Sequence, residues 1–463
     1  MADRTEVREP ARSTRVAKDV DVVVAGGGLA GVCAAVASAR AGASTLLVER
    51  NTCAGGVATA SLEPSICNYF HTADHRKAIG GAPLEFIERL VALGAASANW
   101  SGSRVHVVYD VELGKLAFDQ MLEDAGVEVL YDTLAADAIV EDDCLRGVIV
   151  QNRSGRQAVL AGSVVDATGD ADVAALAGTP MRDGPAMVHS FLFRLGNVDL
   201  DETFRYIIDH PENDMRGHDI DLTIDEWAHA WETTGILLFH HHAATKMPLI
   251  QDAIANGTYT KEWGPFKKMD AFQMHGIRSS GTLVVNTGYF EMAEPDAEQI
   301  SYYMRWGRKL AHHVGAFLRD TLPGCRDSFV CATASDLGLR RTRWIDGEFT
   351  FTREMQDAAS RFPDAIGRGV VMEPKVLRIT DRTYDVPLRA LLPRGPRNLI
   401  IGSGRSTSST PAETLRTMPL TMVVGQGAGV AAALAAKTQR DVRDVPMADL
   451  QSELVRQGVL FGD

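Results

Sequence analysis

The residues of this chain best suited to moving a proton near neutral pH are its histidines, most of which fall between residues 185 and 383. Three are consecutive, His240, His241 and His242, and His275 follows in the segment FQMHGIRSS. General base catalysis is the chemistry that such side chains support. Alternatively, the triplet forms a turn with one ring inside the protein and two in water, and has no catalytic role. We predict that one of these four histidines is a general base.

Arginine side chains in the same region could hold an anionic group, because the guanidinium fork matches a carboxylate. Arg278 closely follows His275, while Arg340 and Arg343 lie in the motif LGLRRTRWIDG. These arginines could instead attach one domain to another; both roles stay open for Arg343, which we retain as a candidate catalytic residue. His189, in MVHSFLFRLG, alternates along an expected strand and could also face the site. No metal site is expected, because no carboxylate accompanies the histidines at HExxH-like spacing.

A glycine-rich turn near the start of the chain, in DVVVAGGGLAGVCAAVASARAGASTLLVER, has the pattern that binds a dinucleotide. An apolar run ends at Gly26, a small-residue helix contains Gly31, and a second apolar run ends at Glu49. Gly26 permits the tight turn, Gly28 lets a pyrophosphate approach the backbone, and Gly31 lets the helix pack closely on the sheet. Glu49 is placed to accept hydrogen bonds from an adenosine ribose, where a 2′-phosphate would meet repulsion. This pattern predicts NAD or FAD rather than NADP.

The composition is that of a folded protein with a large core: 463 residues, 45% hydrophobic and 23% charged, predict two or three domains. The net charge of −13 and the lack of a Lys/Arg block argue against a nucleic-acid partner. Six cysteines without a CxxC pair indicate reduced thiols rather than disulfides or a zinc site. The first 18 residues are charged and lack the apolar stretch of a signal peptide, so we expect a disordered tail in a cytoplasmic protein.

One segment, Thr417 to Ala436, carries no charge over 20 residues, which is long enough to cross a membrane. It contains Pro419 and Gln426, and alanine rather than leucine supplies its bulk. We therefore interpret it as a helix packed inside the protein and expect no membrane partner. Close helix packing would also explain its glycines, Gly425, Gly427 and Gly429.

The order of elements along the chain indicates an α/β fold. After the opening strand, helix and strand, the pattern predicts a helix over Val111–Ala125 and a strand over Val127–Tyr131. A β-meander follows, with turns at Asp142–Asp143 and Ser154–Gly155. The region from 185 to 383 has longer irregular segments, which suits a substrate domain inserted into a nucleotide-binding domain.

Several separated motifs together resemble the FAD-dependent oxidoreductases of the glutathione-reductase-like superfamily, in particular the bacterial FAD dependent oxidoreductase family. In chain order, the matches are the glycine-rich turn, Gly55–Gly56, VVDATGDADVAALAG, LGLRRTRWIDGEF, YDVPLRALLPRGPRNLIIGSGR and TMPLTMVVGQGAGVAAA. The chain departs from its relatives at Gly288, near a position where they often have an arginine, and at Arg341, where they often have an acid. Substrate contacts are therefore not transferred from the family.

The resemblance implies FAD as the cofactor, bound by a Rossmann-like domain with a central parallel sheet and a β-meander, into which an α+β substrate domain is inserted. The implied division is a tail at 1–18, the FAD-binding domain at 19–184 and 384–440, the insert at 185–383 and a C-terminal helical segment at 441–463. The residues expected to bind FAD are Gly26, Gly28, Leu29, Ala30, Gly31, Glu49, Arg50, Gly55, Gly56, Leu134, Ala135, Ala167, Thr168, Gly169, Gly402, Pro419 and Leu420. Leu134 and Ala135 would contact the adenine through backbone groups, and the helix end at Pro419 would face the flavin's pyrimidine ring.

The function that follows from this resemblance is hydride transfer between a small organic substrate and N5 of the flavin. The fold does not choose between a dehydrogenase or oxidase and a reductase. One alternative is a flavin-bound electron-transfer subunit or binding protein that needs a partner. A flavin monooxygenase is a weaker alternative, because Asp183–Gly184 has only a passing likeness to its signature. A homo-oligomer is left open.

Overall fold

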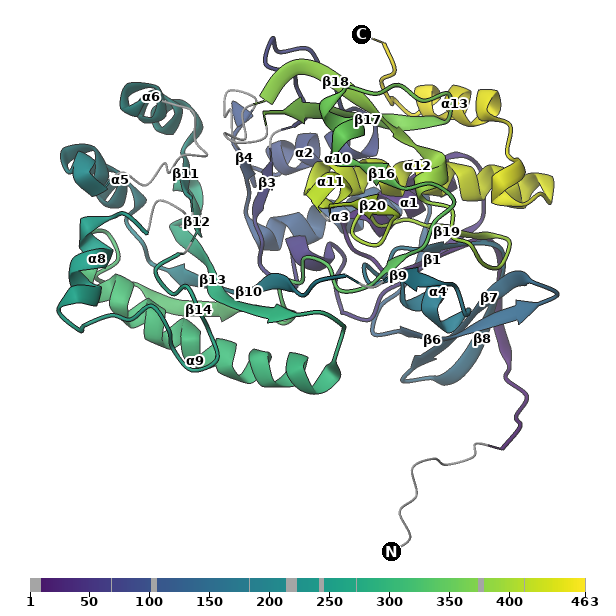
Figure 1. Cartoon of the computed structure of the whole chain (residues 1–463), viewed down its shortest axis with the longest axis horizontal. Coiled ribbons are helices and arrows are strands. Elements are labelled where there is room, and N and C mark those ends of the chain that lie inside the picture. The colour runs from purple at the N-terminus through teal and green to yellow at the C-terminus, as the bar shows by residue number, and fades with distance from the viewer. Residues whose placement is uncertain are drawn as a thin grey trace, which may run out of the picture.

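The computed structural model describes residues 10–67, 69–100, 106–182, 184–213, 223–240, 245–271, 273–373, 379–411 and 413–462. Two lobes lie side by side, each built on its own sheet (Figure 1). The larger lobe contains a seven-stranded sheet and both ends of the described chain, and the smaller lobe contains a five-stranded sheet. This architecture confirms the predicted fold class, an α/β domain joined to an additional domain.

The sheet of the larger lobe combines parallel strands with an antiparallel meander. Its strand order is β5 (Glu128–Leu130), β2 (Thr45–Val48), β1 (Val16–Ala25), β8 (Gly155–Asp166), β7 (Cys144–Asn152) and β6 (Leu134–Glu141), with β19 (Leu399–Ile401) also paired to β8. The pairs β1–β2, β1–β8, β2–β5 and β8–β19 are parallel, whereas β6–β7 and β7–β8 are antiparallel. The apolar run Val22–Ala25 is fully buried, as expected for parallel strands covered on both faces.

The first strand begins earlier than the sequence predicts, inside the tail expected at 1–18. Val16 and Lys18 pair with Ala158 and Val159 of β8. The long strand β8 offers unpaired backbone groups to this segment, so it joins the sheet although its side chains are polar or exposed. The boundary expected at residue 18 therefore falls too late.

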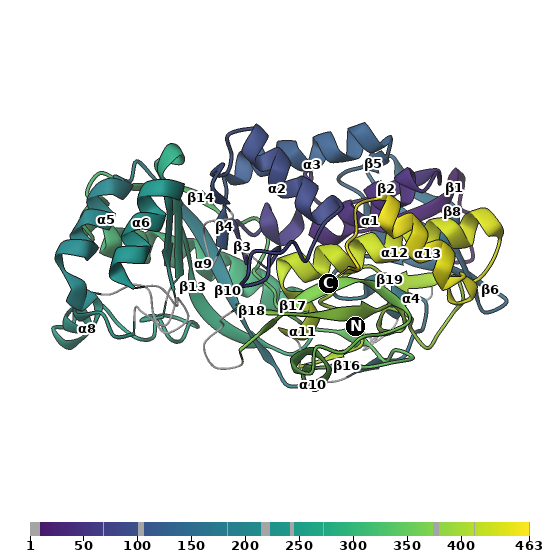
Figure 2. The ribbon, with the colours of Figure 1, turned by 90° about the horizontal axis from the view of Figure 1, so that it is seen from above.

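Helices cover the larger sheet in layers (Figure 2). They include α1 (Leu29–Arg40), α2 (Ala82–Ala92), α3 (Val111–Ala125) and α12 (Met418–Thr438). The bounds of α3 are those predicted from the sequence. Asp110 fixes its start, because the Asp110 carboxylate accepts hydrogen bonds from the backbone N–H groups of Glu112 at 2.9 Å and Leu113 at 3.0 Å.

Helices α1 and α12 touch backbone to backbone. A Cβ on Gly425 would lie 2.0 Å from the carbonyl oxygen of Ala30, and a Cβ on Gly429 would lie 2.1 Å from that of Ala34. The predicted packing role of these glycines is therefore confirmed. Within the described residues, α12 is the one helix long and apolar enough to cross a membrane. Its most apolar stretch is 83% buried inside the protein.

The sheet of the smaller lobe is antiparallel throughout its described strands. In order, these are β11 (Ile236–Phe239), β12 (Gln273–Ile277), β13 (Thr282–Met292), β10 (Met187–Gly196) and β14 (Phe329–Thr333). Its helices are α5 (Leu200–Asp209), α6 (Ile224–Thr234), α8 (Pro248–Ala255) and α9 (Ala297–Thr321). The long helix α9 runs along the sheet (Figure 1), and its buried Leu310 and Val314 belong to the apolar core of this lobe.

Shorter elements complete the fold around and between the two sheets. Paired strands are β3 (Ser65–Cys67) with β4 (His106–Val108), β9 (Met181–Arg182) with β15 (Trp344–Ile345), β16 (Phe351–Thr352) with β20 (Ser409–Thr410), and β17 (Ala365–Met372) with β18 (Ile379–Pro387). The remaining α-helices described are α4 (Asp172–Leu176), α10 (Arg353–Asp357), α11 (Glu413–Arg416) and α13 (Met447–Arg456).

The strand β17 and the first part of β18 fall within the range 185–383 predicted for the insert, yet both strands pack against the larger lobe (Figure 2). A Cβ on Gly367 of β17 would lie 2.5 Å from a methyl group of Val423 in α12. This close approach ties β17 to α12, whereas the strands and helices of the smaller lobe end at Thr333.

We expect Gly425→Val to lower the free energy of unfolding by about 1–3 kcal/mol, because a side chain there forces α12 away from α1. Thermal unfolding followed by circular dichroism measures this change. Gly462→Val is the control, since a Cβ on Gly462 meets nothing within 4 Å. A melting temperature of Gly425→Val equal to that of the control would contradict the close helix packing.

Candidate active site

A cavity of about 480 Å³ is lined by residues of both lobes, a volume typical of small-molecule sites. The turn between β1 and α1 and the ends of β2 and β8 form one part of its wall, and β3, β4 and strands of the smaller lobe form another. The predicted cofactor-binding residues on this wall are Gly26, Gly28, Leu29, Ala30, Glu49, Arg50, Gly56, Ala167, Thr168, Gly169 and Leu420.

The glycine-rich turn leaves open space where a dinucleotide is expected. Gly26 has a φ of +97°, and a Cβ there would lie 2.5 Å from the carbonyl oxygen of Ala167, so the turn requires glycine. A Cβ on Gly31 would lie 1.8 Å from the carbonyl oxygen of Gly26. In contrast, a Cβ on Gly28 meets nothing within 4 Å, and Gly28 lines the cavity. The space in front of Gly28, at the start of α1, therefore fits the pyrophosphate of the expected FAD.

Glu49 stands after β2 with its carboxylate fixed in the cavity wall. Its Oε2 accepts a hydrogen bond from the Gly27 N–H at 2.5 Å, and its Oε1 accepts one from the Asn51 N–H at 2.7 Å. Oε1 also accepts from Nδ2 of Asn51 at 2.9 Å, so Oε2 is the oxygen that keeps capacity to accept from a ribose hydroxyl. The adjacent Arg50 forms an ion pair with Asp336, which follows β14 of the smaller lobe. Arg50 therefore links the two lobes beside the cofactor end of the cavity.

The cavity wall does not include six described residues that were predicted to bind FAD: Gly31, Gly55, Leu134, Ala135, Gly402 and Pro419. Packing explains the glycines among them. A Cβ on Gly55 would lie 2.6 Å from the side chain of Thr59, and a Cβ on Gly402 would lie 2.4 Å from that of Val165. These glycines let segments approach one another beneath the site.

The remaining three of these residues differ in their surroundings. Leu134 and Ala135 begin β6, and Leu134 is 51% exposed on the meander, so their contact with the adenine stays a prediction. Pro419 is buried in the first turn of α12, but its neighbours Met418 and Leu420 line the cavity. The N-terminal end of α12 thus faces the site through these neighbours rather than through Pro419.

Among the four histidines predicted as bases, His240 lies on the cavity wall. It directly follows β11 and is only 5% exposed. His241 and His242 lie outside the described residues. His275 of β12 is buried away from the wall, with its Nδ1 3.3 Å from Oε1 of Glu63, which does line the cavity. The structure therefore places His240 at the site and His275 behind a carboxylate of the site.

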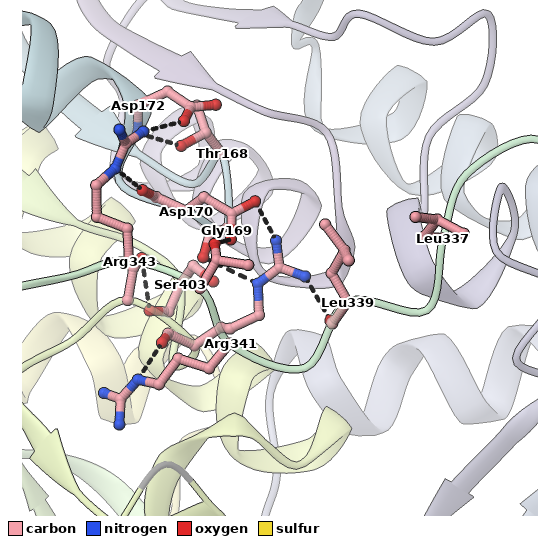
Figure 3. A network of polar contacts seen from close by, with 12 residues as sticks. Thr168, Gly169, Asp170, Asp172, Leu337, Leu339, Arg341, Arg343 and Ser403 are labelled. Carbon is pink, nitrogen blue, oxygen red and sulfur yellow. Dashed lines mark hydrogen bonds and ion pairs between the residues drawn. The ribbon is translucent and has the colours of Figure 1, made fainter. Parts of the chain in front are cut away.

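Arg343 is engaged away from the cavity wall (Figure 3). Its Nε donates a hydrogen bond to the carbonyl oxygen of Asp170 at 2.8 Å, and its Nη2 donates to the carboxylate of Asp172 at 2.5 Å. These contacts favour the attachment role over the predicted catalytic role, because the guanidinium is held by the chain after β8. Arg278 is likewise held, in an ion pair with Asp201 at 3.0 Å.

Arg340 is the arginine of the LGLRRTRWIDG motif that lines the cavity. Its backbone N–H donates to Nδ1 of His189 at 3.0 Å, and Nε2 of His189 donates to the carbonyl oxygen of Met292 at 2.9 Å. Burial lowers the pKa of His189 to about 4, so this ring is neutral and both of its nitrogens are occupied. His189 therefore positions the backbone of Arg340 and does not act as a proton acceptor.

A network around Asp170 joins three segments next to the cavity. Arg405 donates hydrogen bonds to the carbonyl oxygens of Gly169 at 2.9 Å and Leu339 at 2.7 Å. It also donates to one carboxylate oxygen of Asp170 at 2.7 Å, and Thr342 donates to the other at 2.5 Å. Gly169, Asp170 and Leu339 converge in Figure 3. The network fixes the chain on both sides of Arg340 relative to the predicted cofactor-binding residue Gly169.

Glu63 was not predicted from the sequence, although its side chain, 16% exposed, lines the cavity. Nδ2 of Asn286 donates to its Oε2 at 3.0 Å. Burial raises the pKa of Glu63 to about 7, and the positive charge of Arg340 opposes part of this rise. A carboxyl group with such a pKa can exchange protons near neutral pH. The sequence does contain a signal for this residue. Glu63 is the only acidic residue between positions 51 and 73, and small and apolar residues surround it.

His106 of β4 is another wall residue that the sequence did not single out. Its Nδ1 lies 2.5 Å from Oγ of Ser65 in the paired strand β3. Burial lowers the pKa of His106 to about 3, and the nearby His240 lowers it further. His106 therefore contributes a neutral hydrogen-bonding ring beside Glu63 and His240.

Comparison with known proteins gives a match over most of the chain. The model of the family described as "FAD dependent oxidoreductase" matches residues 21–454. The chain is also similar to digeranylgeranylglycerophospholipid reductase 2 of Methanothermobacter thermautotrophicus, with 33% identity over 206 residues, 40% of this chain and 49% of that protein. The match thus covers about half the length of this curated relative.

Two solved structures resemble the chain over most of its length. A geranylgeranyl bacteriochlorophyll reductase-like protein of Thermoplasma acidophilum has a TM-score of 0.45 and 13% identity, covering 96% of this chain and 84% of that one. The p-nitrophenol 4-monooxygenase of Pseudomonas putida has a TM-score of 0.40 and 11% identity, covering 94% and 81%.

We expect Gly28→Leu to abolish retention of FAD while leaving the fold intact. The φ of Gly28 is −66°, which any residue adopts, and the added side chain would occupy the space assigned to the pyrophosphate. Absorbance of the flavin released on heating, per mole of protein, measures retention, and circular dichroism checks folding. A normal flavin content in folded Gly28→Leu would place the cofactor elsewhere.

Proposed function

The chain belongs to the FAD dependent oxidoreductase family, and from that premise we propose that it transfers a hydride between a small organic substrate and N5 of FAD. The family makes the chain an FAD-dependent enzyme. When bound, FAD supplies the hydride acceptor or donor. The chain itself must hold the cofactor, orient the substrate and move a proton. Placement in the wider glutathione-reductase-like superfamily is part of the proposal, supported by the parallel sheet with its meander.

The glycine-rich end of the cavity would hold FAD. Gly28 leaves space for the pyrophosphate, and the Glu49 carboxylate accepts hydrogen bonds from ribose hydroxyls. Met418 and Leu420 bring the N-terminal end of α12 to the same cavity. The positive end of a helix stabilises negative charge, which suits the pyrimidine side of a flavin.

The observation that carries the proposal is the continuity of the cavity, whose wall includes both Gly28 and Glu63. A substrate bound beside Glu63 therefore shares one cavity with the cofactor.

Glu63 is the residue that we assign to proton transfer. A substrate C–H bond releases its hydride more readily when an adjacent O–H or N–H group loses its proton. As the hydride passes to the cofactor, Glu63 accepts that proton and becomes a neutral carboxyl, the form that burial favours. Asn286 orients the acceptor through its hydrogen bond to Oε2. His240 is the second candidate for this role, because it lines the same cavity.

The wall near Glu63 favours a small polar substrate. Its side chains include Ser65, His106, Gln273 and Asn286, all of which can form hydrogen bonds. The curated relative is named for a digeranylgeranyl lipid. These side chains can bind a compound with hydroxyl, amino or carboxyl groups, so we do not extend the lipid substrate to this chain.

We expect a member of a panel of alcohols, amines and acids to bleach the flavin of the holoenzyme under anaerobic conditions. With that compound, Glu63→Gln should slow flavin reduction by about 10²–10⁴-fold, the usual effect of losing a general base, without changing FAD content. Stopped-flow absorbance measures the rate. The exposed Glu141→Gln is the matched control and should react at the normal rate. Flavin that no compound reduces, but that a cell extract reduces, would favour an electron-transfer subunit instead.

The rate of flavin reduction at limiting substrate should rise with pH through about 7, because Glu63 must be ionised to accept a proton. Below this pH the carboxyl is protonated and the rate falls. Glu63→Gln should remove this inflection, and His240→Ala should keep it. The opposite pattern would assign the base to His240.

A further inference from the structure

Another part of the cavity wall, formed by α10 and β18, carries polar groups that the proposed hydride transfer does not use. Arg353, Gln356 and Tyr384 line this part of the wall. Arg353 and Gln356 are three residues apart on α10 and share one face of that helix. Tyr384 projects from β18, and its ring stacks on Phe351 with centroids 5.7 Å apart. The three side chains converge from two elements on one space.

Two polar atoms of this group are buried without a hydrogen-bond partner among the described residues, the hydroxyl of Tyr384 and Oε1 of Gln356. Tyr384 is 0% exposed and Gln356 is 2% exposed. A buried polar group without a partner costs about 1–3 kcal/mol, so such groups mark places where another molecule completes the bonding. Both residues line the cavity, which is where that molecule would bind.

Arg353 adds a positive charge that no carboxylate of the described cavity wall neutralises. Within the described chain, Arg353 has no ion pair or hydrogen bond through its guanidinium. Its charge acts on Tyr384, where burial raises the pKa of the phenol and Arg353 offsets part of that rise. The phenol therefore stays protonated and can donate a hydrogen bond beside the guanidinium.

The acids on the described wall are all engaged elsewhere. Glu49 accepts from the backbone of Gly27, Asp336 pairs with Arg50, and Glu63 accepts from Asn286. No acid of the described wall is therefore paired with Arg353, and its guanidinium is available to an anion that enters the cavity.

We infer that Arg353, Gln356 and Tyr384 bind the carboxylate of a small acid, which makes carboxylic acids the substrate class of the enzyme. The inference rests on the proposed function, because it places the acid in the cavity of the hydride transfer. A planar carboxylate accepts paired hydrogen bonds from a guanidinium. The phenol of Tyr384 and Nε2 of Gln356 can donate to it as well, whereas the buried Oε1 of Gln356 can only accept, from another polar group of the substrate. Strand β3 begins two residues after Glu63, and its Ser65 and Cys67 line the same cavity as this group. A substrate anchored at Arg353 can therefore extend towards Glu63.

The test is titration of the oxidised holoenzyme with benzoate and with benzamide, a matched pair that differs in charge, while the flavin absorbance spectrum reports binding. We expect benzoate to bind at least 10-fold more tightly than benzamide. Arg353→Met should weaken benzoate binding at least 10-fold with FAD content unchanged, and Arg353→Lys should restore part of it. Arg278→Met, which alters an arginine that pairs with Asp201 away from the cavity wall, should leave benzoate binding within about twofold.

Equal binding of benzoate and benzamide would overturn the inference, as would normal benzoate binding by Arg353→Met. Loss of FAD from Arg353→Met would also overturn it, because this part of the wall would then serve the cofactor. Inorganic phosphate that binds more tightly than benzoate would also overturn the inference, because the site would then prefer a phosphate to a carboxylate. The titration needs no turnover, so failure of every compound to reduce the flavin would count against the proposed function alone.

Discussion

The carboxylate of Asp170 accepts hydrogen bonds from two segments that are far apart in the sequence, at Thr342 and Arg405. Arg405 also binds the backbone of Gly169 and Leu339. These bonds link the turn after β8, which lines the cofactor end of the cavity, to the chain that carries Arg340. A buried charge needs such partners, so the network holds only in one arrangement of the three segments. The positions of the cofactor end and the polar end of the cavity relative to each other depend on it.

Glycine is required at different positions of the larger lobe by different physical constraints. Gly26 is required by a positive φ, and Gly425 and Gly429 are required because α1 and α12 meet through their backbones. Gly28 is required by neither, since its backbone suits any residue and its Cβ would enter open space. Only a bound molecule gives a reason for glycine at this position. The contrast separates residues that build the fold from the residue that leaves room for the cofactor.

The polar end of the cavity contains groups that a protein does not bury without a use. The pKa of the Glu63 carboxyl is raised to about 7 because burial opposes its ionisation. The hydroxyl of Tyr384 stays protonated and without a protein partner. One group is thus suited to exchange a proton and the other to donate a hydrogen bond, and both line the cavity that also contains the cofactor end. These different surroundings suit Glu63 to proton transfer and Tyr384 to anchoring the substrate.

The sequence by itself determined the class of the protein and the cofactor end of its site. The glycine spacing from Gly26 to Gly31, the acid at Glu49 and the apolar strands are local patterns, and local patterns are what a sequence displays. Even the bounds of α3 were predictable, because Asp110 caps it. The polar end was different. Glu63, His106 and Asn286 come from three segments that meet only after the lobes pack, and His275 and Arg343 were turned away from the cavity by partners distant in the chain. Tertiary structure decided those positions, because burial and contact between remote residues have no local signature.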